Sequence, residues 1–415
     1  MSLSTALRWS SAQTVIRMAL GLVSAKVSAI YLGPPGVALV AQIGNLIQVA
    51  QGTIGNGAQT AVVKLTAIRQ EQREPVVALW STALTMVMCA SLIYIIVSAS
   101  AARALSNWLL SSEHYSSAII LSSIVVGAAV IETVVVSALN GLKRIDLVAK
   151  ASIASTLFEV LAYTLLVAKF GLWGGLYGIS AVYVAKLMAT LIVSFGSKAV
   201  RARDFRGPFS WPLAQSIAAF YPMLLAQSIA LPMSQILVRN TVIDRLGLDA
   251  AGYLQAVWRL SDIYVSVFTT ALGMFFIAHY SSLREGAARM QMLRRTVLQV
   301  VLLTASAAAV IYVFRYLVFE LVLSRQFLPA ADWLPMQLFG DVFKMAAYVM
   351  QMTLVAEGRA TLYVAIAVGG PAIYVILTWV LLPSWSGQAA PIAYATSHLV
   401  AFTVLGLAFQ RFASK

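Results

Sequence analysis

The length of its apolar runs constrains this chain more than any other feature. A helix needs about 20 apolar residues to cross the hydrocarbon core of a bilayer. Runs this long are expected to be helices, because a helix satisfies its own backbone hydrogen bonds where water is absent. The chain holds twelve such runs, near 10–32, 37–62, 76–101, 117–139, 147–168, 172–196, 213–237, 251–278, 296–314, 333–356, 361–382 and 388–410.

The composition agrees with this pattern. Of the 415 residues, 60% are apolar and 11% are charged, whereas soluble proteins carry roughly 25% charged residues. The net charge of +14 would suggest nucleic-acid binding in a soluble protein. Here the basic residues fall mostly in short loops, and we expect a bilayer and no nucleic acid as partner. The sequence predicts an all-α polytopic membrane protein with twelve transmembrane helices.

The basic residues also predict an orientation. With the N-terminus inside, the inner segments hold 18 of the 29 Lys and Arg residues, and the outer segments hold 6, including Arg239. Cytoplasmic loops are enriched in Lys and Arg, so both termini are predicted to be cytoplasmic. The other five basic residues lie inside spans: Arg17, Lys26, Lys186, Arg259 and Lys344.

The longest polar connector of mid-chain divides the spans six plus six. It is residues 198–212, which predicts an N-terminal lobe at 1–197 and a C-terminal lobe at 213–415. A short echo supports two repeated halves. "LGPPGVALVAQIGNL" at 32–46 leads into the second span, and "LGLDAAGYLQAVWRLSD" at 246–262 leads into the eighth. Repeated halves with a site between them are common in secondary transporters.

Two spans of the second half carry matching polar stripes. Arg259 and Asp341 each lie eight residues into their spans, and Asp262 and Lys344 each lie eleven in. Charges inside a bilayer are costly and usually face a bundle interior or a wet cavity. If the two helices face each other, Arg259 is expected to meet Asp341, and Asp262 to meet Lys344. Such pairs would either lock the second half together or serve substrate binding or ion coupling.

The first half has polar stripes of its own. Helical spacing aligns Ser10, Thr14, Arg17, Gly21, Ser24 and Ser28 in the first span, with Lys26 about half a turn away. Arg17 and Lys186 would contact an anion or pair locally with Glu132 or Glu159, and Glu132 looks comparatively isolated. The second span presents an amide face that would bind sugar hydroxyls or hold helices together: Asn45, Gln48, Gly52, Asn56 and Gln59.

The motifs that are missing narrow the function. The sequence contains no Walker A motif, selectivity-filter signature, His–Glu metal motif or nucleophile elbow, and its loops are too short for a typical membrane polymerase or ligase. We therefore expect a transporter with no metal and no cofactor. Basic groups in a low-dielectric interior attract anions strongly, and amides suit hydroxyl groups. Together they suggest an amphiphilic substrate with phosphate and sugar.

Several stretches resemble one family. "MSLSTALRW", "IYLGPPGVAL", "SDIYVSVFTTALGMFF", "LPMQLFGDVFKMAAYV" and "AYATSHLVAF" are similar to the Wzx-type flippases for O-antigen and enterobacterial common antigen lipid intermediates, in the MOP (MATE-like) exporter superfamily. The resemblance implies two six-helix lobes in a V around a central cavity. It also implies alternating-access flipping of an undecaprenyl-pyrophosphate-linked oligosaccharide from the cytoplasmic to the periplasmic leaflet of a bacterial inner membrane. Charged family positions fall on Arg17, Lys26, Asp262, Asp341 and Lys344.

These considerations give a set of candidate residues and partners. Glu132 and Glu159 are coupling candidates for a proton or sodium gradient, and polymerase and chain-length proteins of the same pathway are candidate partners. A MATE-like cation or drug antiporter is the rival transporter, but its site should be net acidic. A membrane polymerase or ligase is the rival enzyme. The predicted substrate-binding residues are Arg17, Lys26, Asn45, Gln48, Asn56, Lys186, Arg259, Asp262, Asp341 and Lys344.

Overall fold

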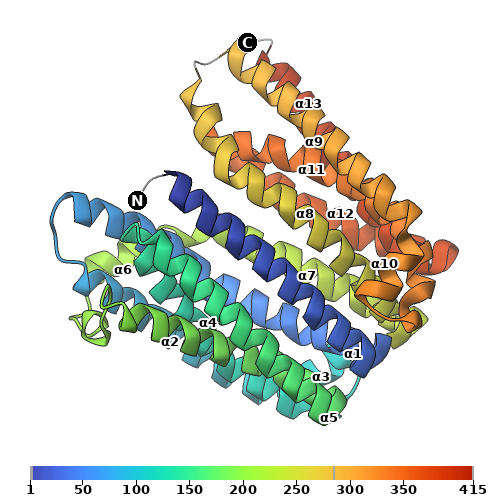
Figure 1. Cartoon of the computed structure of the whole chain (residues 1–415), viewed down its shortest axis with the longest axis horizontal. Coiled ribbons are helices and arrows are strands. Elements are labelled where there is room, and N and C mark those ends of the chain that lie inside the picture. Colours follow the sequence, from blue (N-terminus) through green and yellow to red (C-terminus); the bar gives the residue numbers. More distant parts are fainter. Residues whose placement is uncertain (1–2, 284–285, 414–415) are drawn as a thin grey trace. The chain divides into compact units, whose positions relative to one another are not determined.

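The computed structural model describes residues 3–283 and 286–413, which form helices and no strands (Figure 1). Contacts divide the chain into two compact units. Unit 1 comprises Met1–Leu32 and Leu39–Met233, and unit 2 comprises Gly33–Ala38 and Ser234–Lys415. The first helices are α1 (Leu3–Glu71), α2 (Val77–Ser100), α3 (Ala102–Leu110), η1 (Glu113–Tyr115), α4 (Ser116–Gly141), α5 (Ile145–Gly196), η2 (Ala202–Phe205) and α6 (Trp211–Ala218).

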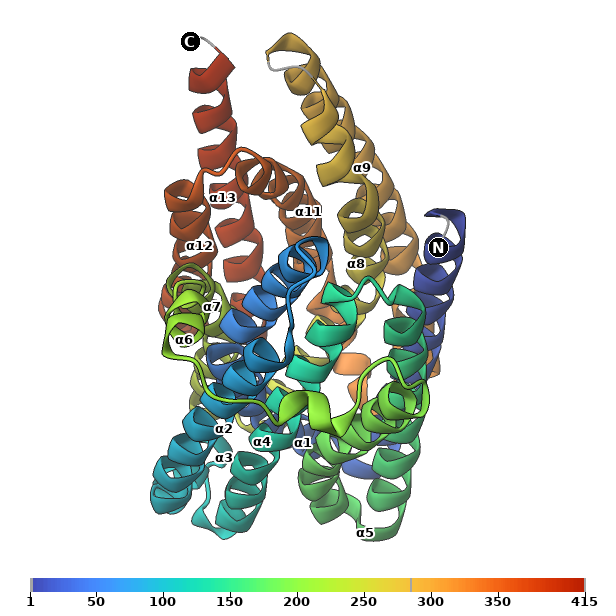
Figure 2. The ribbon, with the colours of Figure 1, turned by 90° about the vertical axis from the view of Figure 1, so that its left-hand side faces the viewer.

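The remaining helices begin with α7, in which the division between the units falls. They are α7 (Tyr221–Leu246), α8 (Leu248–Ser282), α9 (Ala287–Val313), α10 (Arg315–Val322), η3 (Arg325–Asp332), α11 (Leu334–Ala356), α12 (Ala360–Trp385), η4 (Ser386–Gln388) and α13 (Ala389–Ala413). In unit 1, α4 packs between α2 and α5 (Figure 2). In unit 2, α11 is the central helix and packs against α8, α9, α12 and α13.

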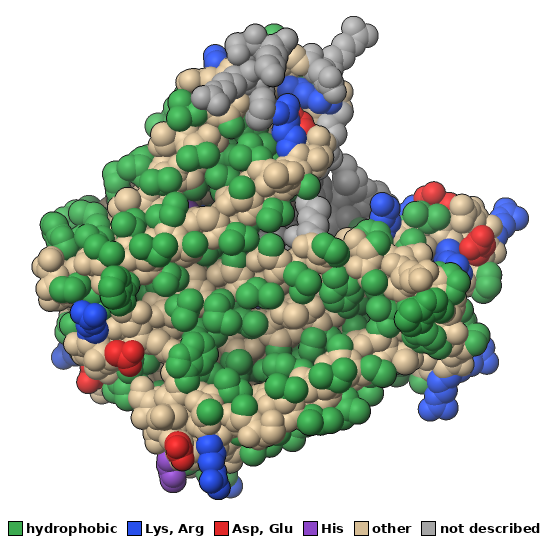
Figure 3. Space-filling view, turned by 180° about the vertical axis from the view of Figure 1, so that it is seen from behind, with side chains coloured by type: hydrophobic (Ala, Val, Ile, Leu, Met, Phe, Trp, Pro, Cys, Tyr) green, Lys and Arg blue, Asp and Glu red, His purple; other side chains and the backbone are tan. Residues whose placement is uncertain are grey.

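The helices are long and apolar enough to span a bilayer. The described residues contain seven candidate membrane-crossing segments. Three of these segments each contain two predicted spans: Ile16–Glu71, Ile145–Gly196 and Ala360–Gln410. The seven segments therefore hold ten of the twelve predicted spans. The other two predicted spans lie mainly in α7 and α8. Large apolar side chains point outward, including Ile93 (64% exposed) and Val313 (67%). Figure 3 shows a face covered mostly by hydrophobic side chains, with charged ones at its margins.

Two backbone breaks repeat between the halves. Gly33 (φ 62°, ψ −176°) interrupts α1, and Gly247 (φ 87°, ψ 174°) separates α7 from α8. Gly171 (φ 54°, ψ −129°) interrupts α5, and Ser386 (φ 44°, ψ −130°) separates α12 from α13. Positive φ values favour glycine, which explains the Leu-Gly echo in the sequence. A short helix also separates two long ones at the same place in each half, α3 before α4 and α10 before α11.

The seventh predicted span differs from expectation in its bounds. The run 213–237 was predicted as one helix, but α6 ends at Ala218 and α7 begins at Tyr221. Pro222 explains the interruption, because its nitrogen cannot donate to the carbonyl of Ala218 four residues earlier. The helix α7 then continues to Leu246. The assignment of Arg239 to an outer loop was therefore wrong, since this residue lies within α7.

The connector 198–212 packs against α2. Phe205 stacks on Trp80 with ring centroids 5.4 Å apart, and the backbone nitrogen of Ser210 donates to Thr82 Oγ1 at 3.0 Å. Ser81 Oγ donates to the carbonyl of Pro208 at 3.3 Å. These contacts fix the connector to unit 1 through both apolar and polar groups.

The close approach of Pro34 to α8 makes Gly252 a sensitive position. A Cβ atom at Gly252 would lie 2.1 Å from the Pro34 carbonyl oxygen, a clash with backbone that no rotamer change relieves. We expect Gly252→Ala to destabilise the protein by about 1–3 kcal/mol. The control is Gly273→Ala on the same helix, which meets nothing within 4 Å and is expected to be neutral or stabilising by up to about 1 kcal/mol. Unfolding midpoints in detergent measure both, and equal midpoints would contradict the clash.

Candidate functional site

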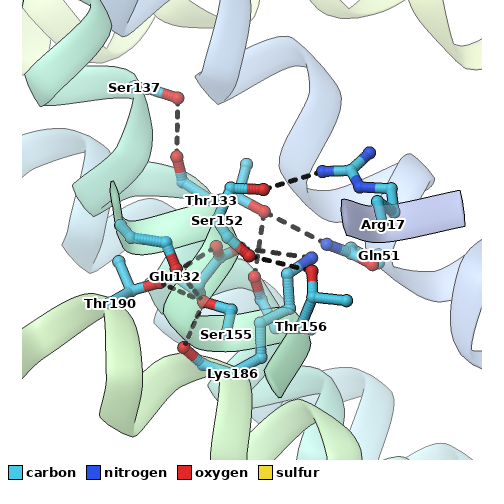
Figure 4. Close-up of polar contacts among 12 residues, drawn as sticks. Arg17, Gln51, Glu132, Thr133, Ser137, Ser152, Ser155, Thr156, Lys186 and Thr190 are labelled. Carbon is cyan, nitrogen blue, oxygen red and sulfur yellow. Dashed lines mark hydrogen bonds and ion pairs between the residues drawn. The ribbon is translucent and has the colours of Figure 1, made fainter. Parts of the chain in front are cut away.

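The polar stripes of α1 and α5 face each other in unit 1. Arg17 Nη2 donates to Ser152 Oγ at 2.9 Å (Figure 4), and the hydroxyls of Ser28 and Tyr163 lie 3.0 Å apart. The partners in both pairs are 135 positions apart in sequence. The first parts of α1 and α5 therefore run in the same direction, in fixed register. The side chain of Arg17 is exposed beyond this contact.

Glu132 on α4 is held by two side chains of α5. Thr190 Oγ1 donates to its Oε1 at 3.3 Å, and Lys186 Nζ lies 3.9 Å from its Oε2. Ser155 extends the chain of contacts, with its hydroxyl 3.2 Å from that of Thr190 (Figure 4). The expectation that Glu132 is isolated was wrong, because helix periodicity cannot indicate which helix packs beside α4. Lys186 was expected either to contact an anion or to pair locally, and the structure shows it paired with Glu132.

Removing Lys186 would leave the carboxylate of Glu132, whose side chain is 10% exposed, without its cation. Breaking a buried ion pair costs about 3–5 kcal/mol, but the Lys186 side chain is 36% exposed, so we expect about 1–2 kcal/mol for Lys186→Gln. The double variant Glu132→Gln/Lys186→Gln should recover most of this loss. Thermal unfolding of the three variants tests the pair. A double variant no more stable than Lys186→Gln would contradict it.

The amide face of α1 divides into two kinds of residue. Asn56 Nδ2 donates to Ser228 Oγ of α7 at 2.7 Å, and the neighbouring Gln51 donates to Thr133 Oγ1 of α4 at 3.2 Å. These amides join helices within unit 1. Asn45 is buried, and its Nδ2 has no hydrogen-bond partner within the described part of the chain. Gln48 and Gln59 are exposed and are therefore the accessible amides of this face.

Two further predicted residues occupy intermediate positions. Lys26 on α1 and Glu159 on α5 are both half-buried. Their predicted roles in substrate binding and coupling remain predictions.

One of the two predicted ion pairs in unit 2 is confirmed. Lys344 Nζ on α11 lies 3.6 Å from Asp262 Oδ1 on α8. The Asp262 side chain is 60% exposed and that of Lys344 is 30% exposed. Arg259, one turn earlier on α8, is also exposed. These three charges therefore lie where solvent or a ligand can reach them.

The contacts observed at Asp341 are hydrogen bonds from hydroxyls, in place of the predicted ion pair with Arg259. Asp341 is fully buried, and three hydroxyls donate to its carboxylate at 2.7 Å: Ser261 to both oxygens, Tyr264 to Oδ2 and Tyr394 to Oδ1. Ser261 and Tyr264 lie on the α8 face toward α11, whereas Arg259 points to an exposed side. Matching depths on two helices could not reveal Tyr394, which α13 contributes.

Gln337 completes this hydroxyl-lined site one turn before Asp341. Its Nε2 donates to Ser261 Oγ at 3.4 Å, while its Oε1 is buried with no partner among the described residues. A carboxylate bonded to neutral hydroxyls can take up a proton without breaking an ion pair. The arrangement thus differs from the one around Glu132, which has Lys186 beside it.

Arg239 is a buried charge that the sequence did not reveal. Its side chain is 1% exposed, its Nη2 donates to Gln255 Oε1 on α8, and its guanidinium carbon lies 5.1 Å from the centre of the Trp258 ring. Trp258 directly precedes Arg259 on α8, and Gln255 lies one turn before Arg259. One feature of the sequence does indicate that Arg239 belongs to the helix: it follows the apolar run 213–237 with no turn residue between them.

The described residues contain no group of three or more His, Cys, Asp or Glu side chains that could hold a metal ion. The polar groups described above in both units are ion pairs, hydroxyls and amides. Unit 1 contributes the Glu132 group and the exposed Arg17 and Gln48. Unit 2 contributes the Asp341 site and the exposed Asp262–Lys344 pair.

Long apolar helices with charges on their polar faces define a polytopic membrane protein. Solved structures agree on the fold. An inward-facing multidrug resistance MATE family transporter of the MOP superfamily aligns with TM-score 0.81 and 14% identity, over 97% of this chain and 94% of the other. The lipid II flippase MurJ, in an inward closed conformation, aligns with TM-score 0.76 and 13% identity, over 97% and 87%.

The sequence comparison defines the family. The polysaccharide biosynthesis protein family matches residues 7–275, and the chain belongs to this family. The lipid III flippase of Escherichia coli (strain K12) is 24% identical over 404 residues, which cover 97% of each chain. The lipid III flippase of Shigella flexneri matches to the same extent.

Proposed function

We propose that this chain is a flippase. It moves an undecaprenyl-pyrophosphate-linked oligosaccharide, such as an O-antigen or enterobacterial common antigen unit, from the cytoplasmic to the periplasmic leaflet by alternating access. The observation that carries the proposal is the match to lipid III flippases over 97% of both chains. The helical fold and the family support a transporter rather than an enzyme.

The structure supports a ranking of the predicted substrate-binding residues. Arg17, Gln48 and Arg259 are exposed, so we assign them the most direct contacts, the arginines to pyrophosphate and the amide to sugar hydroxyls. Asp262 and Lys344 are accessible as a pair, which a negatively charged head group would separate by competing for the lysine. Lys26, Asn45, Asn56, Lys186 and Asp341 are more enclosed and would act mainly by shaping the site.

We propose further that a proton or sodium gradient drives transport. Glu132 and Glu159 were the predicted coupling residues, and the contact between Glu132 and Lys186 weakens the case for Glu132. The carboxylate of Asp341 accepts from hydroxyls, so it can take up a proton without breaking an ion pair. Asp341 therefore joins the coupling candidates ahead of Glu132.

Deleting the gene tests the function. We expect lipid-linked glycan units to accumulate on the cytoplasmic side and surface polysaccharide to be lost, with both restored by the wild-type gene. The rival is a MATE-like drug or cation antiporter, which the fold similarity to a MATE transporter favours. Normal surface polysaccharide together with lost drug resistance would establish the rival and reject the flippase. Pathway polymerase and chain-length proteins would act on the flipped product.

The proposed inner-membrane orientation can be tested with single cysteines. The chain has one cysteine, Cys89, so Cys89→Ser gives a cysteine-free background. We expect Arg203→Cys to react with a membrane-impermeant maleimide only after cells are opened, because 198–212 is cytoplasmic. Glu113→Cys should react in cells with a permeabilised outer membrane. The reverse labelling pattern would place both termini in the periplasm.

A further inference from the structure

A groove of about 380 Å³ lies within unit 2 between α9 and α13. Met350 of α11 lines it from between the two walls, and Phe402 and Phe409 line it from α13. Met350 and Phe409 are 7% and 4% exposed, so they form the closed side. Leu298 of α9 lines the groove at 59% exposure, so the other side opens outward, toward lipid in a membrane protein.

The groove has one basic end. The start of α9 and the C-terminal end of α13 lie at the same end of unit 2 (Figure 1). At this end Arg294 and Gln410 line the groove beside the apolar Met290 and Leu293. Further along, the lining is apolar or lacks a side chain, from Val297 to Val301 on α9 and from Phe402 to Gly406 on α13. The groove thus combines a basic end with an apolar length.

We propose that this groove binds an anionic phospholipid of the surrounding leaflet. One acyl chain lies along Met350 between α9 and α13, and the phosphate lies beside the guanidinium of Arg294. Basic pockets between transmembrane helices at a membrane surface bind anionic head groups, and guanidinium–phosphate hydrogen bonds are strong and directional. The volume lies within the range of ligand pockets, roughly 300–1,000 Å³. This site is independent of the transported substrate.

The size and charge of the groove favour a phospholipid over an undecaprenyl chain. An undecaprenyl chain is more than twice as long as an acyl chain, and its pyrophosphate carries more charge than one guanidinium neutralises. Among the lining residues, Arg294 is the basic side chain, which suits a single phosphate. Arg295 beside it is exposed and does not line the groove, which provides a matched control.

Native mass spectrometry of the purified full chain tests the site. The protein is mixed with phosphatidylglycerol or phosphatidylcholine of the same acyl chains. We expect wild-type protein to retain phosphatidylglycerol preferentially, and Arg294→Gln to lower its bound fraction about fivefold. Arg295→Gln, with the same change in charge, should have little effect. Val297→Trp should fill the groove and displace the lipid, whereas Leu302→Trp on the exposed side of α9 should not.

Several outcomes would overturn the proposal. Equal binding of phosphatidylcholine would remove the role of the anionic head group. Equal effects of Arg294→Gln and Arg295→Gln would reduce the binding to general surface charge. Displacement of phosphatidylglycerol by undecaprenyl phosphate at equal concentration would show that the groove binds the isoprenoid lipid instead. Because lipid retention is measured without transport, failure of the flippase proposal leaves the test of this groove intact.

Discussion

Replacement of Asp341 with alanine is expected to abolish transport and to destabilise unit 2. The carboxylate accepts hydrogen bonds from Ser261, Tyr264 and Tyr394 in a fully buried site. Each buried polar group that loses its partner costs about 1–3 kcal/mol. Allowing for reorientation of the hydroxyls, we expect a total of about 3–5 kcal/mol. The unfolding midpoint of the purified protein in detergent should fall by roughly 5–10 °C.

Asp262→Ala is the matched control for this variant. Asp262 is also an aspartate near α11, but its side chain is 60% exposed, and exposed ion pairs contribute about 0–1 kcal/mol. Its unfolding midpoint should stay close to that of the wild type. If Asp341→Ala and Asp262→Ala unfold at the same temperature, the hydroxyls around Asp341 do not stabilise the protein.

Asp341→Asn separates stability from coupling. Asparagine keeps the size of the side chain and one acceptor oxygen, so we expect a much smaller loss of stability than with alanine. It removes the charge, so transport should be lost or should no longer respond to the ion gradient. Glycan flipping in cells and in proteoliposomes with an imposed gradient measures this. Gradient-driven transport by Asp341→Asn at the wild-type rate would reject Asp341 as a coupling residue.

Arg239→Ala is the second change with a large expected effect. The substitution removes a side chain that is 1% exposed and leaves a cavity between α7 and α8. Large-to-small substitutions in a core cost about 2–5 kcal/mol. It also removes the donor to Gln255 Oε1 and the cation over the Trp258 ring. We expect a loss at the upper end of that range, read from the unfolding midpoint.

Three further variants define the cause of this loss. Arg245→Ala removes an exposed arginine of the same helix and should change stability little. Arg239→Met fills most of the space without the charge, and Arg239→Lys keeps the charge without the planar guanidinium. If packing dominates, methionine rescues better than lysine. Wild-type stability in Arg239→Ala would mean that the buried guanidinium costs as much as its contacts provide.

The sequence was sufficient for the long apolar helices, apart from the bounds of the seventh span, and for one contact between them. Hydrophobic run length predicted the spans because each helix must cover the same hydrocarbon thickness. Asp262 and Lys344 were matched by depth, and they meet at 3.6 Å. The same reasoning failed for Asp341 because its acceptor oxygens are filled by hydroxyls from two helices. A depth match between two helices carries no information about a third.

Arg239 and Ser386 show two other limits of the sequence. A hydropathy pattern assigns a charge at the border of an apolar run to the loop, so it cannot predict that Arg239 is buried within α7. The break at Gly247 repeats that at Gly33 and left a Leu-Gly echo. The break at Ser386 repeats the backbone of Gly171 with a serine at positive φ, an uncommon conformation for a residue with a Cβ. The breaks at Gly171 and Ser386 therefore share a backbone conformation but not a residue type, so the sequence does not show this repeat.

The register between α1 and α5 bears on how this chain can change in evolution. The contacts of Arg17 with Ser152 and of Ser28 with Tyr163 are separated by eleven residues on each helix, close to three helical turns. One inserted residue between Arg17 and Ser28 would rotate everything beyond it by about 100° and separate Ser28 from Tyr163. We therefore expect insertions and deletions to be tolerated outside residues 17–28 and 152–163. Within these segments, only substitutions, or matching insertions in both helices, preserve the pairing.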